Sequence, residues 1–216
     1  MRKLLAIWLG KILTIVGKTV GKKSSSSPGA YALKICPDLV KCLEKCVSKG
    51  IIVTCGTNGK TTTNNLMASA LEAKGYKVIC NKLGANMLSG IATTVLQEMS
   101  IFGKLKADYA CLEIDEAYTP IVFDYVKPDV MVITNLFRDQ LDRNGEVETL
   151  ILKVKKFLET FEGNVVLNAD DPNVARLGLA NPNNKNIHYF SVDRYQGATD
   201  KPYEVGEGKF CPFCDT

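Results

Sequence analysis

Residues 51–63 read IIVTCGTNGKTTT, in which a short apolar run is followed at once by a glycine-containing turn. Such a run, when a turn bounds it, predicts a buried strand, and the residues after this turn fit a helix. Glycines let the backbone approach an anion and point successive N–H groups toward it, and the start of a helix adds its dipole. The chain is therefore expected to be an α/β protein that binds a phosphorylated ligand.

The turn differs from the standard phosphate loop, Gly-x4-Gly-Lys-Ser/Thr. That motif needs a glycine at position 54, where Thr54 stands, and here Gly56 and Gly59 bracket two residues instead. The chemistry is kept, since Lys60 would reach the β- and γ-phosphates and Thr61 would hold a Mg²⁺ ion. The alternative is a glycine-rich turn with a surface lysine, which the strand before and the helix after disfavour.

Apolar strand patterns alternate with helical patterns along most of the chain, which predicts a mostly parallel sheet covered on both faces. Ligands of such sheets bind at the carboxyl ends of the strands, so functional residues should directly follow strands. The predicted strands are 51–55, 76–80, 109–114, 130–134, 165–167 and 187–190, and the predicted helices are about 38–49, 61–74, 89–100, 146–161 and 173–178.

The net charge of +4 belongs to the N-terminal segment, because residues 1–23 hold six basic residues and no acidic one. The rest of the chain has 21 basic and 23 acidic residues, which excludes a nucleic-acid-binding basic surface. We therefore expect no nucleic-acid partner.

Residues 1–23 also read as an amphipathic helix with one basic and one apolar face. Three interpretations remain open: a helix packed on its own domain, contact with a membrane surface, and a cleaved signal peptide. SSSSPG at 24–29 is interpreted as a linker. The basic face comprises Lys11, Thr14, Lys18 and Lys22, and the apolar face comprises Leu5, Leu9, Ile12, Leu13, Val16 and Val20.

Eight dispersed cysteines fit buried free thiols better than a disulfide scaffold, since several lie in apolar strands. In residues 38–49, two cysteines lie on an apolar helical stripe that Gly50 would end, so thiols are favoured over a metal site there. His188, the only histidine, lies in an apolar strand pattern and is interpreted as structural.

Four segments resemble the Mur ligase superfamily, which includes the folylpolyglutamate synthases. TCGTNGKTTT is similar to the short ATP loop of that family, which lacks the first glycine. CLEIDEA (111–117) resembles the segment whose glutamate binds Mg²⁺, so the resemblance makes Glu113 that ligand together with Thr61. VLNADDP (166–172) is similar to the segment whose asparagine meets the adenine, here Asn168, with a turn-forming cluster as the alternative.

The fourth segment, ITNLFRDQLDR (133–143), is similar to the family's Asn-x3-Asp-His-x-Asp block, which matches Asn135, Asp139 and Asp142. Gln140 replaces the histidine that helps to bind a second metal ion in many members, so a second metal site is not assigned. Lys153 and Lys155 lie near the position of a carbamylated lysine in many members, and neither is given a role. The expected ATP-binding residues are Gly56, Thr57, Asn58, Gly59, Lys60, Thr61, Thr62, Asn135 and Asn168.

Nearly the whole chain, from about 18 to 214, resembles the MurT family of lipid II isoglutaminyl synthase subunits, as in NKLGANMLSGIATTVL and NLFRDQLDRNGEVETL. This resemblance implies a cytoplasmic ligase, at the inner face of the membrane, that activates the D-glutamate α-carboxylate of lipid II with ATP. A separate GatD-type glutaminase subunit would supply ammonia. The alternatives are an amino-acid ligase of the Mur or folylpolyglutamate type and a non-catalytic nucleotide- and zinc-binding module.

The last residues, KFCPFCDT, place Cys211 and Cys214 as Cys-Pro-x-Cys, which is half of the ligand set of a structural Zn²⁺. MurT-type proteins insert a four-cysteine zinc ribbon at this point, and a redox pair or idle thiols are the alternative. We therefore interpret the chain as an N-terminal fragment, which we expect to be inactive as a ligase on its own. The expected organisation is a helix and linker over 1–30, an incomplete ATP-binding domain over 31–205 and half a zinc ribbon over 206–216.

Overall fold

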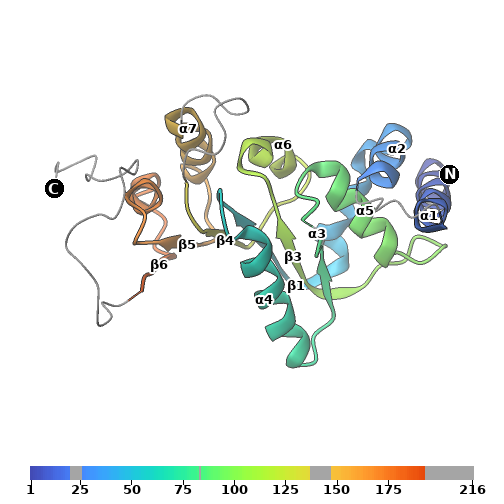
Figure 1. Ribbon diagram of the computed structural model, residues 1–216, viewed down its shortest axis with the longest axis horizontal. Coiled ribbons are helices and arrows are strands. Elements are labelled where there is room, and N and C mark those ends of the chain that lie inside the picture. The colour runs from blue at the N-terminus through green and yellow to red at the C-terminus, as the bar shows by residue number, and fades with distance from the viewer. Residues whose placement is uncertain (20–25, 83, 137–146, 193–216) are drawn as a thin grey trace.

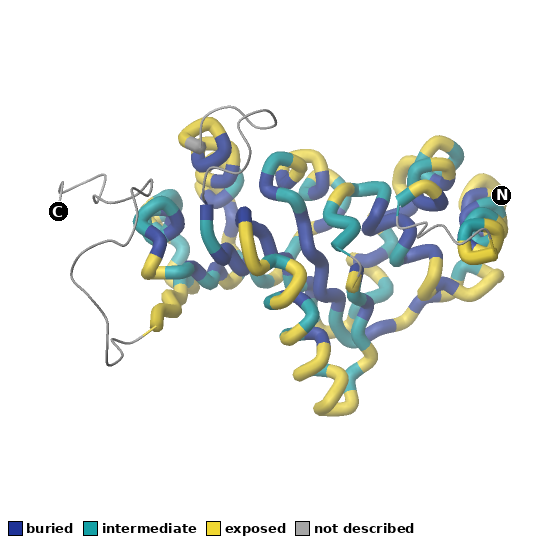
Figure 2. Tube along the Cα trace, viewed as in Figure 1, coloured by how far each residue is buried: buried dark blue, intermediate teal, exposed yellow. Residues whose placement is uncertain are grey.

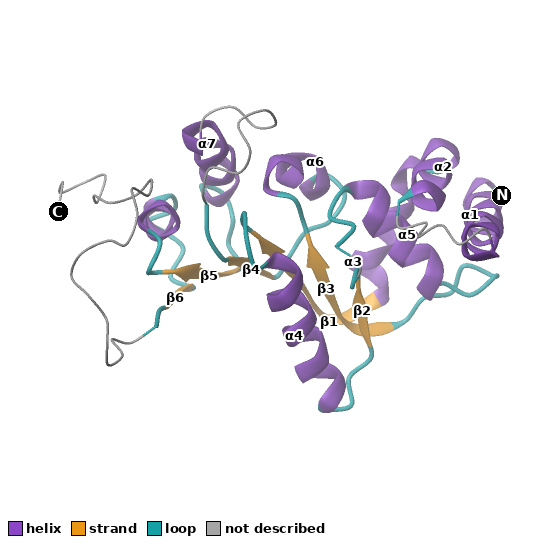
Figure 3. Ribbon diagram, in the orientation of Figure 1, coloured by secondary structure: helices purple, strands orange, loops and turns teal. Residues whose placement is uncertain are grey.

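A six-stranded parallel sheet forms the centre of the protein. The structure is a computed structural model that describes residues 1–19, 26–82, 84–136 and 147–192. Every hydrogen-bonded strand pair is parallel, and the strand order is β2-β3-β1-β4-β5-β6 (Figure 3). The strands are β1 (Val47–Cys55), β2 (Val78–Cys80), β3 (Ala107–Glu113), β4 (Val130–Ile133), β5 (Asn164–Asn168) and β6 (Ile187–Phe190). The predicted parallel α/β sheet is confirmed.

Helices cover the sheet on both faces, as the crossover connections of parallel strands require. Helix α4 packs against β1, β2 and β3 from one side, while α5, α6 and α7 lie on the other side (Figure 1). The α-helices are α1 (Arg2–Thr19), α2 (Ser27–Ile35), α3 (Leu43–Cys46), α4 (Lys60–Ala73), α5 (Leu88–Glu98), α6 (Thr119–Phe123), α7 (Val147–Leu158) and α8 (Pro172–Ala175). Short 3-10 helices span Pro37–Cys42, Glu116–Tyr118 and Arg176–Leu179.

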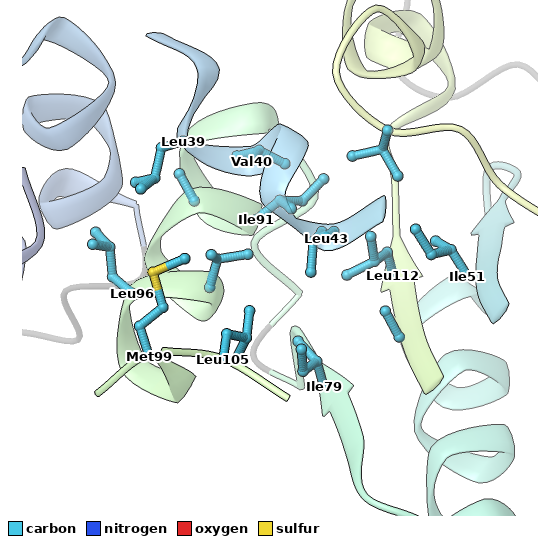
Figure 4. Packing of buried hydrophobic residues seen from close by; sticks show 14 of the residues in the cluster. Leu39, Val40, Leu43, Ile51, Ile79, Ile91, Leu96, Met99, Leu105 and Leu112 are labelled. Carbon is cyan, nitrogen blue, oxygen red and sulfur yellow. The ribbon is translucent and has the colours of Figure 1, made fainter. Parts of the chain in front are cut away.

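Two apolar clusters fill the layer between the sheet and the helices opposite α4. One cluster joins β1, β2 and β3 to α5 and to the segment before β1, where Leu39, Leu43 and Leu112 are buried (Figure 4). The other joins β4 and β5 to α7. Both clusters hold helices against this face of the sheet, while the parallel pairing of the strands brings their carboxyl ends to one edge.

The N-terminal helix packs on α2 and α5, as in the interpretation of a helix on its own domain. The side of the helix that packs on the domain is nevertheless not the predicted apolar face. Thr14, which was assigned to the basic face, is buried together with Ala6, Ile7 and Gly10, whereas the predicted apolar residues Leu5, Ile12 and Val16 are exposed. Small residues allow close helix contact at the buried face, and a pattern that counts only large apolar residues does not detect this.

Two predictions about the segment before β1 are also corrected. Ser27, Pro28 and Gly29, which were assigned to the linker, form the first turn of α2, where proline is favoured because its missing N–H needs no partner. The helix predicted to reach Gly50 ends at Cys46, and β1 begins at Val47. Gly50 therefore lies inside the strand, and it pairs with Tyr109 of β3.

The cysteines that the structure describes are free thiols. Cys55 and Cys111 are buried, and burial raises the pKa of the Cys111 thiol to about 12, which keeps it protonated and unreactive. Among the described residues, no group of three or more His, Cys, Asp or Glu could hold a metal ion. His188 is exposed on the edge strand β6, where its ring Nε2 lies 3.4 Å from Asn164 Oδ1.

Several predicted residues lie outside the described residues: Asp139, Gln140 and Asp142, as well as Cys211 and Cys214. The zinc ribbon therefore stays a prediction. Within the described ranges, no helix is both long and apolar enough to cross a bilayer.

Candidate nucleotide site

The loop over residues 56–59 connects the carboxyl end of β1 to α4. Gly56 has φ +129°, and a Cβ there would lie 2.3 Å from Thr134 Oγ1 and 2.7 Å from the Asn135 carbonyl oxygen. Gly59, the residue before α4, has φ +78°, but a Cβ there would meet nothing within 4 Å. Gly56 thus has neither the conformation nor the space for a side chain, whereas only the backbone conformation favours glycine at Gly59.

The segment after β4 holds this loop in place. The N–H of Thr57 donates to the Asn135 carbonyl at 2.8 Å, and the N–H of Asn58 donates to Asn135 Oδ1 at 2.7 Å. In return, Asn135 Nδ2 and Thr134 Oγ1 donate to the Asn58 carbonyl at 3.0 and 2.8 Å. The predicted site residue Asn135 therefore lies against the loop, with its amide bonded to the loop backbone.

These bonds define where an anion can be bound. The loop N–H groups of Thr57 and Asn58 already donate within the protein. The remaining donors are the N–H groups at the start of α4, because the first turn of a helix has no partners for them. Thr61 and Thr62 lie in that turn and are exposed. The structure thus moves the expected anion contact from the whole loop toward the start of α4.

Lys60 folds back over the loop and meets a carboxylate that the sequence analysis did not identify. Its Nζ donates to the carbonyls of Gly56 and Thr57, the latter at 3.0 Å, and to Glu116 Oε2 at 3.1 Å. The side chains of Lys60 and Glu116 are only 13% and 7% exposed. Burial weakens the screening of this ion pair, so Glu116 helps to hold the Lys60 ammonium group over the loop.

Thr61 and Glu113 lie together, as the sequence analysis predicted for a Mg²⁺ site. Thr61 Oγ1 donates to Glu113 Oε2 at 2.7 Å, and Asn86 Nδ2 donates to Glu113 Oε1 at 3.4 Å. A Cβ on Gly84 would lie 3.5 Å from Thr61 Oγ1, so the absent side chain leaves room beside this pair. A carboxylate and a hydroxyl are hard oxygen donors, which suit Mg²⁺ when phosphate and water complete its shell.

Asn81 fixes the backbone of Glu113. Its Oδ1 accepts from the Glu113 N–H, and its Nδ2 donates to the Glu113 carbonyl, both at 2.8 Å. This buried asparagine follows β2 directly, which is where functional residues were expected, but it is one of several polar residues there. Spacing alone could not have singled it out.

Asn168, the predicted adenine contact, lies at the carboxyl end of β5. Its Nδ2 donates to the Thr134 carbonyl at 2.9 Å, and its Oδ1 accepts from the Asp170 N–H at 2.9 Å. Asp171, which is buried, accepts from the Leu136 N–H at 2.7 Å. These bonds join the ends of β4 and β5, so the described site residues from β1, β3, β4 and β5 all lie at one edge of the sheet.

The Glu116 carboxyl yields a prediction about stability. Burial raises its pKa, and Lys60 opposes this without cancelling it, so the folded protein holds a proton that the unfolded chain loses near pH 4.5. The free energy of unfolding should therefore fall as the pH rises from 4.5 through the raised pKa. Glu116→Gln should remove this part of the pH dependence in urea unfolding curves. If the free energies of unfolding of wild type and variant fell in parallel over this pH range, the prediction would be wrong.

Comparison with known proteins gives the family context of this site. A sequence model of the Mur ligase middle domain matches residues 53–208. The MurT subunit of lipid II isoglutaminyl synthase from Staphylococcus aureus strain COL is 35% identical over 99% of the chain, and the MurT subunit from Streptococcus pneumoniae is 39% identical over 89%. The chain covers 47% and 41% of these two relatives, so it spans somewhat less than half of their length.

Solved structures share the fold. MurF ligase from Thermotoga maritima, solved in complex with ADP, superposes with a TM-score of 0.58 at 20% identity over 76% of the chain and 37% of that protein. A pseudomurein peptide ligase type C from Methanothermus fervidus gives a TM-score of 0.55 at 27% identity over 80% of the chain and 33% of that protein.

Proposed function

The chain belongs to the Mur ligase family, and we propose that it carries the nucleotide-binding part of an ATP-dependent ligase that amidates lipid II in peptidoglycan synthesis. The observation that carries the proposal is a pair of neighbouring contacts at the carboxyl edge of the sheet: Lys60 with Glu116, and Thr61 with Glu113. A cation, a helix start and a hard-oxygen pair suit a triphosphate. The names of the two MurT relatives support the choice of substrate.

The chemistry begins with activation of a carboxylate. A carboxylate is a poor electrophile, so the γ-phosphoryl group of ATP is transferred to an oxygen of the D-glutamate α-carboxylate, and ADP leaves. The nitrogen of ammonia then attacks the acyl carbon, the bond to the phosphorylated oxygen breaks, and inorganic phosphate leaves as the nitrogen loses a proton. The products are D-isoglutamine, ADP and phosphate.

The residues of this chain position and neutralise the phosphates. Lys60 supplies the positive charge beside the loop, and the N–H groups at the start of α4 supply donors. Asn135 holds the loop in shape through the Asn58 backbone. Thr61 and Glu113 would hold Mg²⁺, which supplies further neutralisation of phosphate charge when bound.

The metal assignment yields a prediction about ATP binding. Glu113→Gln keeps the size of the side chain but removes the charge that would attract Mg²⁺. In the wild type, the affinity for ATP should be higher with Mg²⁺ than with EDTA. In the variant, the ratio of these two affinities should be smaller by a factor on the order of ten. Calorimetric titrations with and without the metal measure it. The surface variant Glu72→Gln is the control, because Glu72 pairs with Lys82 away from the loop.

The partners follow from the same proposal. Ammonia would come from a GatD-type glutaminase subunit, as the glutamine-hydrolysing name of the relatives indicates for those proteins. Lipid II is the acceptor, and the ligase acts in the cytoplasm at the inner face of the membrane. Structural Zn²⁺ at Cys211 and Cys214 remains part of the proposal as a prediction about residues outside the described ranges.

Because the chain spans less than half of its MurT relatives, the test of the proposed function uses it within a full-length ligase, with Mg²⁺, ATP, an ammonium salt in place of the glutaminase, and lipid II. The expected result is ADP release together with a mass change of lipid II in which one carboxyl OH becomes NH2. Addition of an amino acid to the peptide would instead identify an amino-acid ligase. Tight ATP binding without either product would identify a nucleotide-binding module.

A further inference from the structure

Helix α1 presents a second apolar side that the protein does not cover. It packs on α2 and α5 through Ala6, Ile7, Gly10 and Thr14, most of which are small. Its larger apolar side chains point elsewhere, and Figure 2 shows much of this helix as exposed. Steps of three and four residues place them on one side of the helix. The exposed residues are Leu4, Leu5, Trp8, Ile12, Ile15 and Val16.

The loop after α5 extends this apolar surface. Trp8 Nε1 donates to the Ile101 carbonyl at 2.9 Å, which fixes the indole ring against the loop. Ile101 and Phe102 are themselves 56% and 73% exposed. Extended exposed apolar patches are rare on monomeric soluble proteins and mark interaction sites. We call this surface the α1 face, formed by Leu5, Trp8, Ile12, Ile15, Val16, Ile101 and Phe102.

The two segments that form the α1 face contain charges of one sign. Residues 1–19 contain Arg2, Lys3, Lys11 and Lys18, residues 99–107 contain Lys104 and Lys106, and neither segment has an acidic residue. A second copy of the chain on this face would bring like charges together, which opposes association. An anionic surface would be attracted by the basic side chains of α1.

We propose that the α1 face binds the surface of an anionic membrane, with α1 lying in the plane of the lipid headgroups. Apolar side chains with basic neighbours are typical of helices that lie on a membrane, and tryptophan and other aromatic side chains are suited to the headgroup region. The helix lies on the bilayer, because no described helix can cross it. This proposal rests on the proposed function: an enzyme that acts on a membrane-bound precursor is closer to its substrate when it is itself bound to the membrane.

The test is co-sedimentation of the protein with phosphatidylcholine vesicles that contain or lack phosphatidylglycerol. Wild type should bind the vesicles with phosphatidylglycerol. The double variant Ile12→Asp/Ile15→Asp should reduce this binding on the order of tenfold or more, since two exposed apolar side chains become anionic. Leu66→Asp is the matched control, because Leu66 is 66% exposed on α4 and lies outside the α1 face, and it should bind as wild type does.

A second variant and a second measurement separate the possible failures. Phe102→Ser changes only the loop, so it should weaken vesicle binding even if the helix variant fails to fold. ATP binding, measured on each variant, reports the proposed function independently of the membrane. Equal binding of wild type and both variants, or no preference for phosphatidylglycerol, would overturn the proposal. The proposal would also be overturned if the wild type were a dimer in solution and the double variant Ile12→Asp/Ile15→Asp were a monomer. The α1 face would then join two copies of the chain.

Discussion

Gly56→Ala should lower the free energy of unfolding by about 3 kcal/mol or more. Two effects add at this position. The φ of +129° is strained for any residue with a Cβ, and the new methyl group would lie 2.3 Å from Thr134 Oγ1 and 2.9 Å from the Asn135 N–H nitrogen. The loop and the segment after β4 would have to separate, which breaks the bonds that Asn135 makes to the loop. Urea unfolding followed by circular dichroism measures the loss.

The control for this prediction is Gly59→Ala, in the same loop. Gly59 has a positive φ of +78°, but a Cβ there meets nothing within 4 Å, so only the backbone strain remains. This variant should lose roughly 1 kcal/mol. If both glycine variants lost the same small amount, the close contact between the loop and the segment after β4 would be wrong.

Lys60→Met should weaken ATP binding by about 100-fold or more, because it removes the positive charge that Lys60 Nζ places beside the loop carbonyls, where the phosphates would bind. Methionine keeps much of the length and apolar stem of lysine. The substitution also leaves the buried Glu116 without its partner, which by itself destabilises the fold. Calorimetric titration with Mg²⁺·ATP gives the affinity, and thermal unfolding shows whether the variant is folded.

The double variant Lys60→Met/Glu116→Gln separates binding from folding. It removes both charges of the ion pair, so the unpaired carboxylate no longer affects stability. ATP binding should stay as weak as in Lys60→Met, since the cation is still absent. Wild-type affinity in the double variant would show that Lys60 acts only to balance Glu116.

The strand, loop and helix around Lys60 could be predicted from the sequence, because each has a strong local signal. Apolar residues specify β1, the two glycines specify the loop, and the lysine follows directly. Thr61 and Glu113 could be predicted to meet, since parallel strands end at the same edge of the sheet. The distance of 2.7 Å between Thr61 Oγ1 and Glu113 Oε2 agrees with that expectation.

Other features depend on tertiary contacts that the sequence does not display. Glu116 is three residues past Glu113, and nothing local distinguishes it from Asp115; only the fold places its carboxylate beside Lys60. The start of β1 at Val47 depends on pairing with Ala107, which is far away in the chain. The buried side of α1 depends on small residues such as Gly10, where a Cβ would lie 2.5 Å from Leu96 Cδ1.

The central claim is that the end of β1 and the start of α4 bind a nucleotide through its phosphates. Calorimetric titration of ATP, ADP and adenosine in the presence of Mg²⁺ tests it most directly. The account predicts that affinity falls in that order, with adenosine weaker than ATP by about 100-fold or more, because the phosphates are the only part of the nucleotide that Lys60 and the α4 N–H groups would contact. Adenosine that binds as tightly as ATP would contradict it.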